Sequence, residues 1–316
     1  MITLVDGSNT VIRLASVARR SGEAGAMVRL VLEFIYWNGV NTDNMVFFWE
    51  GNDSTKSKQL INPEYKQGRA SIKDEEYFEN AFTLTKLILN NLNICNIQVE
   101  GCEADDLIGH LTINSDKPIK IISEDHDYTQ LLVKPNVCIN RPMKKILITD
   151  KDVLDVEGII TENYILAKAI CGDKSDNIKG VTSVDIPRLS YYFPELCLKK
   201  YCADDFLSEI SNIEYINENK FVEKRDYNFR CGLIEKIINN EKLLKNNIQL
   251  MEMRNIPELE KNKLEYQINK FNDSVKPLDK KVLMNIIAMN QVKFDFRKFQ
   301  SLYLILTKFS KNKIEF

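Results

Sequence analysis

Histidine is scarce in this chain, which has two among its 316 residues. The seven cysteines are odd in number and form no C-x-x-C pair. The scarcity of histidine and the lack of closely paired cysteines both disfavour a zinc site, whose ligands are histidine and cysteine. We therefore expect the cysteines to be reduced thiols in a reducing compartment.

Long apolar runs are also missing. No stretch approaches the roughly 18 residues that a membrane-spanning helix needs, and the N-terminus has no signal-peptide pattern. Met1 leads directly into an apolar strand, Ile2–Val5. We therefore expect an intact cytoplasmic protein that does not interact with membranes.

Carboxylates, by contrast, gather around one predicted helix and one predicted strand. Glu103, Asp105 and Asp106 lie in the first turn of a helix that ends near residue 112, and Asp125 and Asp127 follow the apolar strand 119–122. Acids at a helix N-terminus gain about 0.3–1 kcal/mol each from the helix dipole, so capping is the alternative interpretation. Five neighbouring acids would repel each other without cations between them, which favours a metal site.

Strands alternate with helices through the first half of the chain. Strands are predicted at 2–5, 45–49, 94–99 and 119–122, with helices at about 10–20, 25–37, 74–92 and 103–112. This pattern predicts an α/β fold with a central, mostly parallel sheet flanked by helices. Because parallel strands end at one edge, Asp6, Glu50, Asp125 and Asp127 should become neighbours there. Segments 137–140 and 145–148 are predicted to form an antiparallel appendage.

A further pair of acids follows a predicted helix over residues 162–171, which Thr161 should cap. Asp173 and Asp176 can lie on one side of the turn that comes next. A glycine-stopped helix with an Asx turn is the alternative. Beyond Val181 the chain has helical periodicity, so we predict a catalytic domain over 1–181 and a helical C-terminal domain over 182–316.

The formal net charge of −2 at first argues against nucleic acid. If the acids form one cation-binding cluster, however, the rest of the chain is net positive. A near-neutral total is thus compatible with a basic binding surface around an acidic pit.

Five motifs now resemble those of a known family, the 5′ nucleases, which includes flap endonucleases and the 5′-exonuclease domains of bacterial DNA polymerases. They are Leu4-Val5-Asp6-Gly7-Ser8-Asn9, Pro63-Glu64-Tyr65-Lys66-Gln67-Gly68-Arg69, Glu103-Ala104-Asp105-Asp106-Leu107-Ile108, Ser123-Glu124-Asp125-His126-Asp127 and Gly172-Asp173-Lys174-Ser175-Asp176-Asn177-Ile178. Within the family the chain looks most like the RNase H of T-even phages.

The resemblance implies a fold with a PIN-like sheet, a degenerate helix–hairpin–helix in the C-terminal part, and a set of nine metal-site acids. These acids are Asp6, Glu50, Glu103, Asp105, Asp106, Asp125, Asp127, Asp173 and Asp176. An oxygen-only donor set suits two Mg²⁺ ions, for which Mn²⁺ can substitute. We assign Glu103, Asp105 and Asp125 mainly to the first ion.

The second ion would be held mainly by Asp127, Asp173 and Asp176. Three other acids, Asp6, Glu50 and Asp106, would orient bound water molecules. Asp6 and Asp106 would take part in catalysis in this way. The chain departs from the family at Glu50, where Asp is usual. It also departs at residues 182–187, which lack the glycine pair of the family's hairpin. Without that glycine pair, we expect duplex binding to rest mostly on lysine and arginine contacts with phosphates.

The basic stretch 52–73 resembles the family's arch, which implies catalytic roles for Lys66 and Arg69. We expect Tyr65 to stack on a base, and Lys66, Arg69, Lys73 and Lys179 to contact nucleic acid. Lys56 and Lys58 are interpreted as solvated. The stretch has too few apolar residues to fold alone, so we expect it to become ordered on DNA.

The function implied is metal-dependent 5′→3′ exonuclease and flap endonuclease activity that removes lagging-strand primers in phage-type replication. The implied partners are 5′-flap, nicked or forked DNA, RNA–DNA hybrid, a single-stranded-DNA-binding protein and a sliding clamp, with the nuclease itself monomeric. Two alternatives stay open: a DNA-junction-binding module with weakened catalysis, and a PIN-like ribonuclease, which would not explain residues 172–181.

Overall fold

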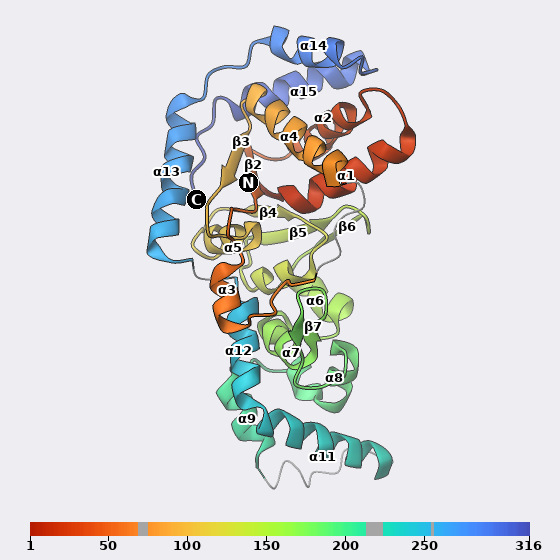
Figure 1. Ribbon diagram of the computed structural model, residues 1–316, viewed down its shortest axis with the longest axis vertical. Helices are drawn as coiled ribbons and strands as arrows, with labels where there is room; N and C mark the ends of the chain where they lie inside the picture. Colours follow the sequence, from red (N-terminus) through yellow and green to blue (C-terminus); the bar gives the residue numbers. More distant parts are fainter. Residues whose placement is uncertain (69–74, 213–223, 254–255) are drawn as a thin grey trace.

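The computed structural model describes residues 1–68, 75–212, 224–253 and 256–316. Figure 1 shows an elongated molecule with a sheet near its middle. Helices α14 and α15 lie at one end of the long axis, and α11 lies at the other. Among the described residues, no helix is long and apolar enough to cross a membrane.

The described residues place six strands in the central sheet, in the order β3-β2-β1-β4-β5-β6. The strands are β1 (Ile2–Asp6), β2 (Asn44–Trp49), β3 (Cys95–Gln98), β4 (Ile119–Ile122), β5 (Val137–Arg141) and β6 (Ile146–Ile148). All neighbouring pairs are parallel except β5–β6. Every residue of β1 and β2 is buried, as expected for parallel strands covered on both faces. The predicted fold class is confirmed.

The predicted antiparallel pair forms as β5 and β6, and it is joined to the main sheet. β5 pairs in parallel with β4, with Val137 opposite Ile119, and β6 then adds to it antiparallel, with Ile148 opposite Ile139. The hairpin therefore extends the main sheet. Its sequence pattern showed two strands but not which strand they join.

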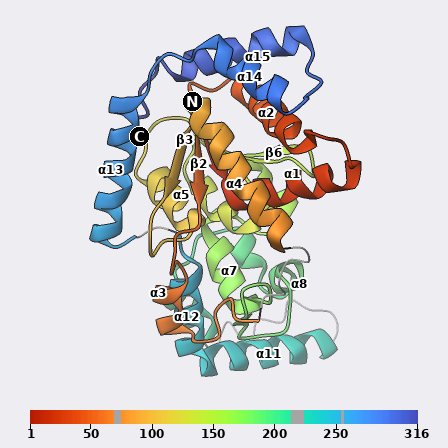
Figure 2. The same cartoon turned by 45° about the horizontal axis from the view of Figure 1, so that its top comes forward.

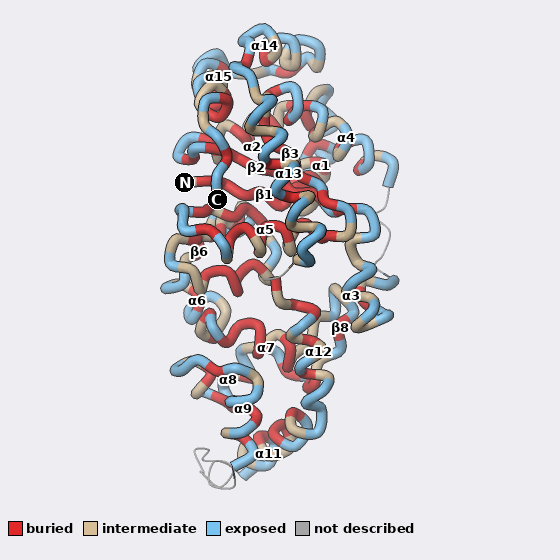
Figure 3. Tube along the Cα trace, turned by 90° about the vertical axis from the view of Figure 1, so that its left-hand side faces the viewer, coloured by how far each residue is buried: buried red, intermediate tan, exposed pale blue. Residues whose placement is uncertain are grey.

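Side chains of alternate strand residues enter two different cores. Val5 and Phe47 face one core with helices α1 (Gly7–Ser21), α2 (Ala26–Gly39), α4 (Glu75–Asn91), α14 (Lys280–Met289) and α15 (Phe296–Phe309). Leu4 and Phe48 face the other, with α5 (Ala104–Ile113), the 3₁₀ helix η1 (His126–Val133) and α13 (Glu258–Ser274). Figure 3 shows the resulting buried centre.

A third hydrophobic cluster forms the part of the molecule below the sheet in Figures 1 and 2. Its elements include α7 (Tyr164–Cys171), β8 (Ile178–Lys179), α8 (Ile186–Tyr192), η3 (Pro194–Cys197), α9 (Ala203–Ile210), α11 (Lys224–Asn239) and α12 (Glu241–Met251). Short elements α3 (Lys56–Ile61), α6 (Asp150–Glu157), η2 (Thr161–Asn163) and β7 (Gly172–Asp173) complete the described chain.

The packing does not follow the predicted division at residue 181. The third cluster joins Ile170 to Leu189 across that position, and α14 and α15 return to the sheet. Thr161 is not the cap of α7 either, because it begins η2 and α7 starts at Tyr164. Apolar periodicity identifies a helix but does not say which surface it covers.

Two helix-interior glycines offer a matched test of this packing. A Cβ on Gly109 of α5 would lie 2.0 Å from the Met253 carbonyl oxygen, whereas a Cβ on Gly232 of α11 would meet nothing within 4 Å. Alanine is favoured over glycine in a helix by about 0.8–1 kcal/mol. Gly232→Ala should therefore raise the free energy of unfolding, while Gly109→Ala should lower it by about 1–3 kcal/mol through overpacking. Denaturant titration measures both, and a stabilising Gly109→Ala would contradict the contact between α5 and the 253 segment.

Candidate metal centre at the carboxyl edge of the sheet

The first acid of the site ends strand β1 and caps helix α1. Asp6 is 8% exposed, and its Oδ1 accepts a hydrogen bond of 3.0 Å from the Asn9 N–H. Its Oδ2 accepts a 3.0 Å bond from the hydroxyl of Ser123, which follows β4. Glu50 directly follows β2 and accepts a 3.2 Å bond from the N–H of Ala104 at the start of α5. The strand ends thus bring these acids together, as the sequence predicts.

Glu103 lies at the centre of the first acidic group and is 1% exposed. Its Oε2 accepts hydrogen bonds from the Lys58 ammonium at 2.7 Å and from the Tyr65 hydroxyl at 2.9 Å. Its Oε1 accepts from the ammonium of Lys66. The Tyr65 hydroxyl also lies 3.3 Å from Oδ2 of Asp176. The segment after β2 therefore crosses the acids and neutralises them.

Asp105 and Asp106 complete this group from the first turn of α5. One carboxylate oxygen from each, together with one from Glu103, can be chosen so that all lie within 4.8 Å of one another. Asp106 also pairs with Lys58, at 3.0 Å. Three oxygen donors so close together could hold one divalent cation.

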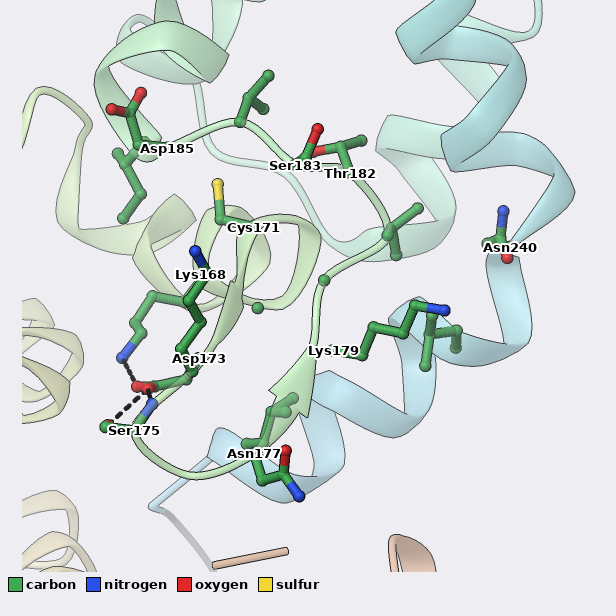
Figure 4. Close-up of a pocket in the computed structure, with 18 of the residues that line it drawn as sticks. Lys168, Cys171, Asp173, Ser175, Asn177, Lys179, Thr182, Ser183, Asp185 and Asn240 are labelled. Carbon is green, nitrogen blue, oxygen red and sulfur yellow. Dashed lines mark hydrogen bonds and ion pairs between the residues drawn. The ribbon is translucent and has the colours of Figure 1, made fainter. Parts of the chain in front are cut away.

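The second acidic group joins η1 to the loop after α7. Lys168 of α7 contacts Asp127 and lies 2.7 Å from Asp173. Asp173 is further held by the Ser175 hydroxyl and N–H, at 2.6 and 2.7 Å. Figure 4 shows Lys168 and Ser175 converging on Asp173. Asp125, through its Oδ1, accepts a 2.8 Å bond from the Asp127 N–H.

Burial and mutual repulsion raise the pKa of several of these acids. Burial, with Asp125 and Asp105 nearby, raises the pKa of Asp6 to about 6. Burial raises the pKa of Asp106 and of Asp127 to about 7 each, with added repulsion from Asp105 and Glu103 in the first case and Asp125 in the second. Burial alone would also raise the pKa of Asp105, but the ammonium groups of Lys58 and Lys66 lower it. The edge therefore holds more carboxylate than its lysines neutralise.

The donor chemistry fits a hard divalent cation. Carboxylate oxygens surround the site, and oxygen ligands suit Mg²⁺ or Mn²⁺. Cys102 is next to Glu103, but burial raises the pKa of its thiol to about 12, with Asp106 adding to the effect. One thiol beside several carboxylates leaves the donor set at this edge mainly oxygen, which suits a hard cation better than zinc.

A cleft of about 1200 Å³ opens beside the second acidic group. It is lined by the 171–186 loop and by α11, and its walls carry Lys168, Lys174, Lys179 and Lys236. The tight fold of this loop requires glycine at two positions. Gly172 has φ +80°, and a Cβ on Gly180 would lie 2.1 Å from the Cys171 carbonyl oxygen. These glycines allow β7 and β8 to approach each other closely, whereas residues 182–187 contain no glycine.

Two expectations for the basic stretch are wrong. Tyr65 is 2% exposed and bonded to Glu103, so its ring has no free face for a base. Lys58 is not solvated, because its side chain is 13% exposed and pairs with Glu103 and Asp106. The side chain of Lys56 is 70% exposed, as expected. Arg69 and Lys73 lie outside the described residues.

The sequence interpretation also missed Lys168. It is the one charged side chain in the helix Tyr164–Cys171, which is otherwise apolar or aromatic. A lone ammonium inside such a helix needs a buried counter-ion, and this signal could have identified it. Lys179, predicted to contact nucleic acid, is exposed at the cleft.

The raised pKa values predict how stability depends on pH. Because Asp6, Asp106 and Asp127 bind protons more tightly than at the ordinary pKa of 3.8, the folded chain holds more protons than the unfolded chain between that pKa and about 7. Their contribution to the free energy of unfolding therefore falls as the pH rises from about 4 to about 7. With a chelator present, the melting temperature should decrease over this range, and less steeply in Asp106→Asn. A melting temperature that rises equally in both proteins would contradict this assignment.

Comparison with known proteins identifies relatives over the sheet and over the acids from Asp6 to Asp127. A family model described as the 5′–3′ exonuclease N-terminal resolvase-like domain matches residues 1–162. A 5′–3′ exonuclease of Buchnera aphidicola subsp. Acyrthosiphon pisum is 27% identical over 198 residues, covering 60% of this chain and 61% of that protein. The thermostable DNA polymerase I of Thermus filiformis is 32% identical over 123 residues, covering 38% of this chain but only 14% of the polymerase.

Solved structures share the fold over nearly the whole chain. T5 5′-exonuclease with bound divalent zinc ions has a TM-score of 0.60 at 18% identity, covering 92% of this chain and 98% of that one. Flap endonuclease-1 from Methanococcus jannaschii has a TM-score of 0.52 at 14% identity, covering 99% and 93%. The closer likeness to T-even phage RNase H stays a prediction. Since the family model spans more than half of a chain whose acids meet at the expected edge, the chain belongs to the 5′–3′ exonuclease family.

Proposed function

We propose that this chain is a metal-dependent 5′→3′ exonuclease and flap endonuclease. It would hydrolyse phosphodiesters in 5′-flap DNA and in RNA–DNA hybrids, and so remove lagging-strand primers. The observation that carries the proposal is the convergence of acids from strand ends, α5, η1 and the 172–176 loop at one sheet edge beside a lysine-lined cleft. Relatives named as 5′–3′ exonucleases support the choice of reaction.

Two Mg²⁺ ions, replaceable by Mn²⁺, are the proposed cofactors, and when bound they would activate a water and stabilise the leaving oxygen. Glu103, Asp105 and Asp125 would hold mainly one ion, and Asp127, Asp173 and Asp176 mainly the other. The grouping of Glu103 with Asp105 and of Asp127 with Asp173 supports this partition. Asp6, Glu50 and Asp106 would orient water, although Asp106 lies close enough to Glu103 to be a ligand itself.

Lys66 is the proposed electrostatic catalyst. Its ammonium contacts Glu103, and its backbone N–H donates a 2.9 Å bond to the Asp176 carbonyl oxygen. The ammonium is therefore held among the proposed metal ligands, where the scissile phosphate would lie. A cation there stabilises charge that develops in the transition state. Arg69 is proposed to act with it on the basis of the motif alone.

The cleft is the proposed path of the nucleic acid. Lys179 is exposed on its wall, with Lys174 and Lys236 nearby, and phosphate contacts of this kind supply salt-dependent affinity without sequence specificity. Without glycines at 182–187, the duplex would be bound mainly by such lysines. A single-stranded-DNA-binding protein and a sliding clamp stay predicted partners, and a monomer stays the predicted state.

The direct test uses a 5′-labelled flap substrate with Mg²⁺ or with EDTA. We expect cleavage near the flap junction with Mg²⁺ and none with EDTA. Binding of the flap without cleavage in Mg²⁺ or Mn²⁺ would instead support the alternative of a DNA-junction-binding module, for which Glu50 in place of Asp is the motivating departure.

A substitution in the second acidic group tests the metal assignment. Asp173→Asn should abolish cleavage while the far-UV circular dichroism spectrum is retained, because it removes a proposed ligand and no core contact. Asp53→Asn is the control, since the side chain of Asp53 is 55% exposed and pairs with Lys56. Full nuclease activity in Asp173→Asn would refute the two-metal assignment.

Lys66 and Lys179 should respond differently to alanine. Lys66→Ala should lower the single-turnover rate by about 100-fold or more while changing affinity little, because its contact is made in the transition state. Lys179→Ala should weaken binding of the substrate but retain the cleavage rate of bound substrate. The slope of log K for binding against the logarithm of the salt concentration should become shallower by about one. Filter binding and rapid quench measure the two quantities. If Lys66→Ala loses only affinity, Lys66 is a phosphate anchor.

A further inference from the structure

Helix α3 contacts the acidic edge through a charged side chain, while the partly buried Ile61 at its end packs against the third hydrophobic cluster. The helix spans six residues, Lys56–Ile61, and none of them is buried. Leu60 is 89% exposed. A helix this short is only marginally stable in water without tertiary contacts. Its position therefore depends on the contacts that its side chains make.

The strongest of these contacts is made by Lys58. Its ammonium lies 2.7 Å from Oε2 of Glu103 and 3.0 Å from Oδ1 of Asp106, with the side chain 13% exposed. It also lies 5.7 Å from the centre of the Tyr65 ring. Other contacts of α3 do not involve the acids: Ile61 packs against the third hydrophobic cluster, and the Gln59 side chain donates a 3.2 Å bond to the Tyr65 carbonyl oxygen.

Lys58 occupies oxygens that a divalent cation would need. Oε2 of Glu103 already accepts from both Lys58 and Tyr65, and a carboxylate oxygen has about two lone-pair sites. A cation that binds Glu103 and Asp106 would therefore take the acceptors of Lys58. Two cations that close together also repel each other strongly at a partly buried site.

We propose that Lys58 is a built-in counter-ion that competes with a divalent cation for Glu103 and Asp106, so that cation binding at these acids loosens α3. This inference rests on the metal site of the proposed function. Its consequence is that the segment leading to Lys66 is held across the acids until the cation binds, and is then released from Glu103 and Asp106. Lys58 acts here through Glu103 and Asp106 and is a positioning residue.

The experiment measures Mn²⁺ binding to the chelator-treated full chain by calorimetry, in the wild type, Lys58→Met and Lys56→Met. Lys56 is the matched control because it lies on the same helix, is 70% exposed and pairs with Asp53. Removal of the competitor should tighten Mn²⁺ binding in Lys58→Met by about tenfold, a typical coupling between sites. Lys56→Met should bind as the wild type does.

A second measurement needs no variant and covers the case in which Lys58→Met does not fold. Amide hydrogen exchange of residues 55–62 in the wild type should become faster at saturating Mn²⁺, while exchange in β1 and β2 should not. Exchange that is unchanged or slower in 55–62 would overturn the inference, as would equal or weaker Mn²⁺ binding by folded Lys58→Met. If the wild type binds no Mn²⁺, both the proposed function and this inference fail. If the wild type binds Mn²⁺ but gives one of the contrary results above, this inference alone fails.

Discussion

Carboxylates gathered at one sheet edge repel one another, and the structure balances this repulsion with lysines from two separate segments. Lys58 and Lys66 reach the Glu103 group from the segment after β2, and Lys168 reaches Asp127 and Asp173 from α7. The balance is incomplete, because the pKa values of Asp6, Asp106 and Asp127 are raised by burial and by neighbouring acids. Excess negative charge held in this way is what gives a divalent cation its affinity.

The parallel sheet makes this concentration of charge possible. β1, β2 and β4 end side by side, so acids more than 100 residues apart, such as Asp6 and Asp125, become neighbours. The two faces of the sheet are covered by helices from both halves of the chain, and α13, α14 and α15 contribute to this cover. The C-terminal region therefore stabilises the scaffold of the site, while α11 forms part of the cleft wall.

The sequence predicts the edge well and its counter-charges poorly, for physical reasons. Asp6 and Glu50 follow apolar strands whose alternation with helices implies a parallel sheet, so their meeting place follows from topology. The positions of Lys58 and Tyr65 depend on how the short helix α3 and the turn after it pack against the start of α5, and no periodicity encodes that. The same holds for the boundary at residue 181, since the apolar stripes of α14 and α15 do not specify the surface that they cover.

The central claim is that the acids of this edge hold divalent cations, and crystals of the chain soaked in Mn²⁺ test it most directly. Anomalous scattering locates manganese independently of any assumption about catalysis. The account predicts peaks within about 2.0–2.6 Å of carboxylate oxygens of Glu103 and Asp105 and of Asp127 and Asp173. A map with no peak at this edge, at Mn²⁺ concentrations that support cleavage of a flap substrate, would contradict it.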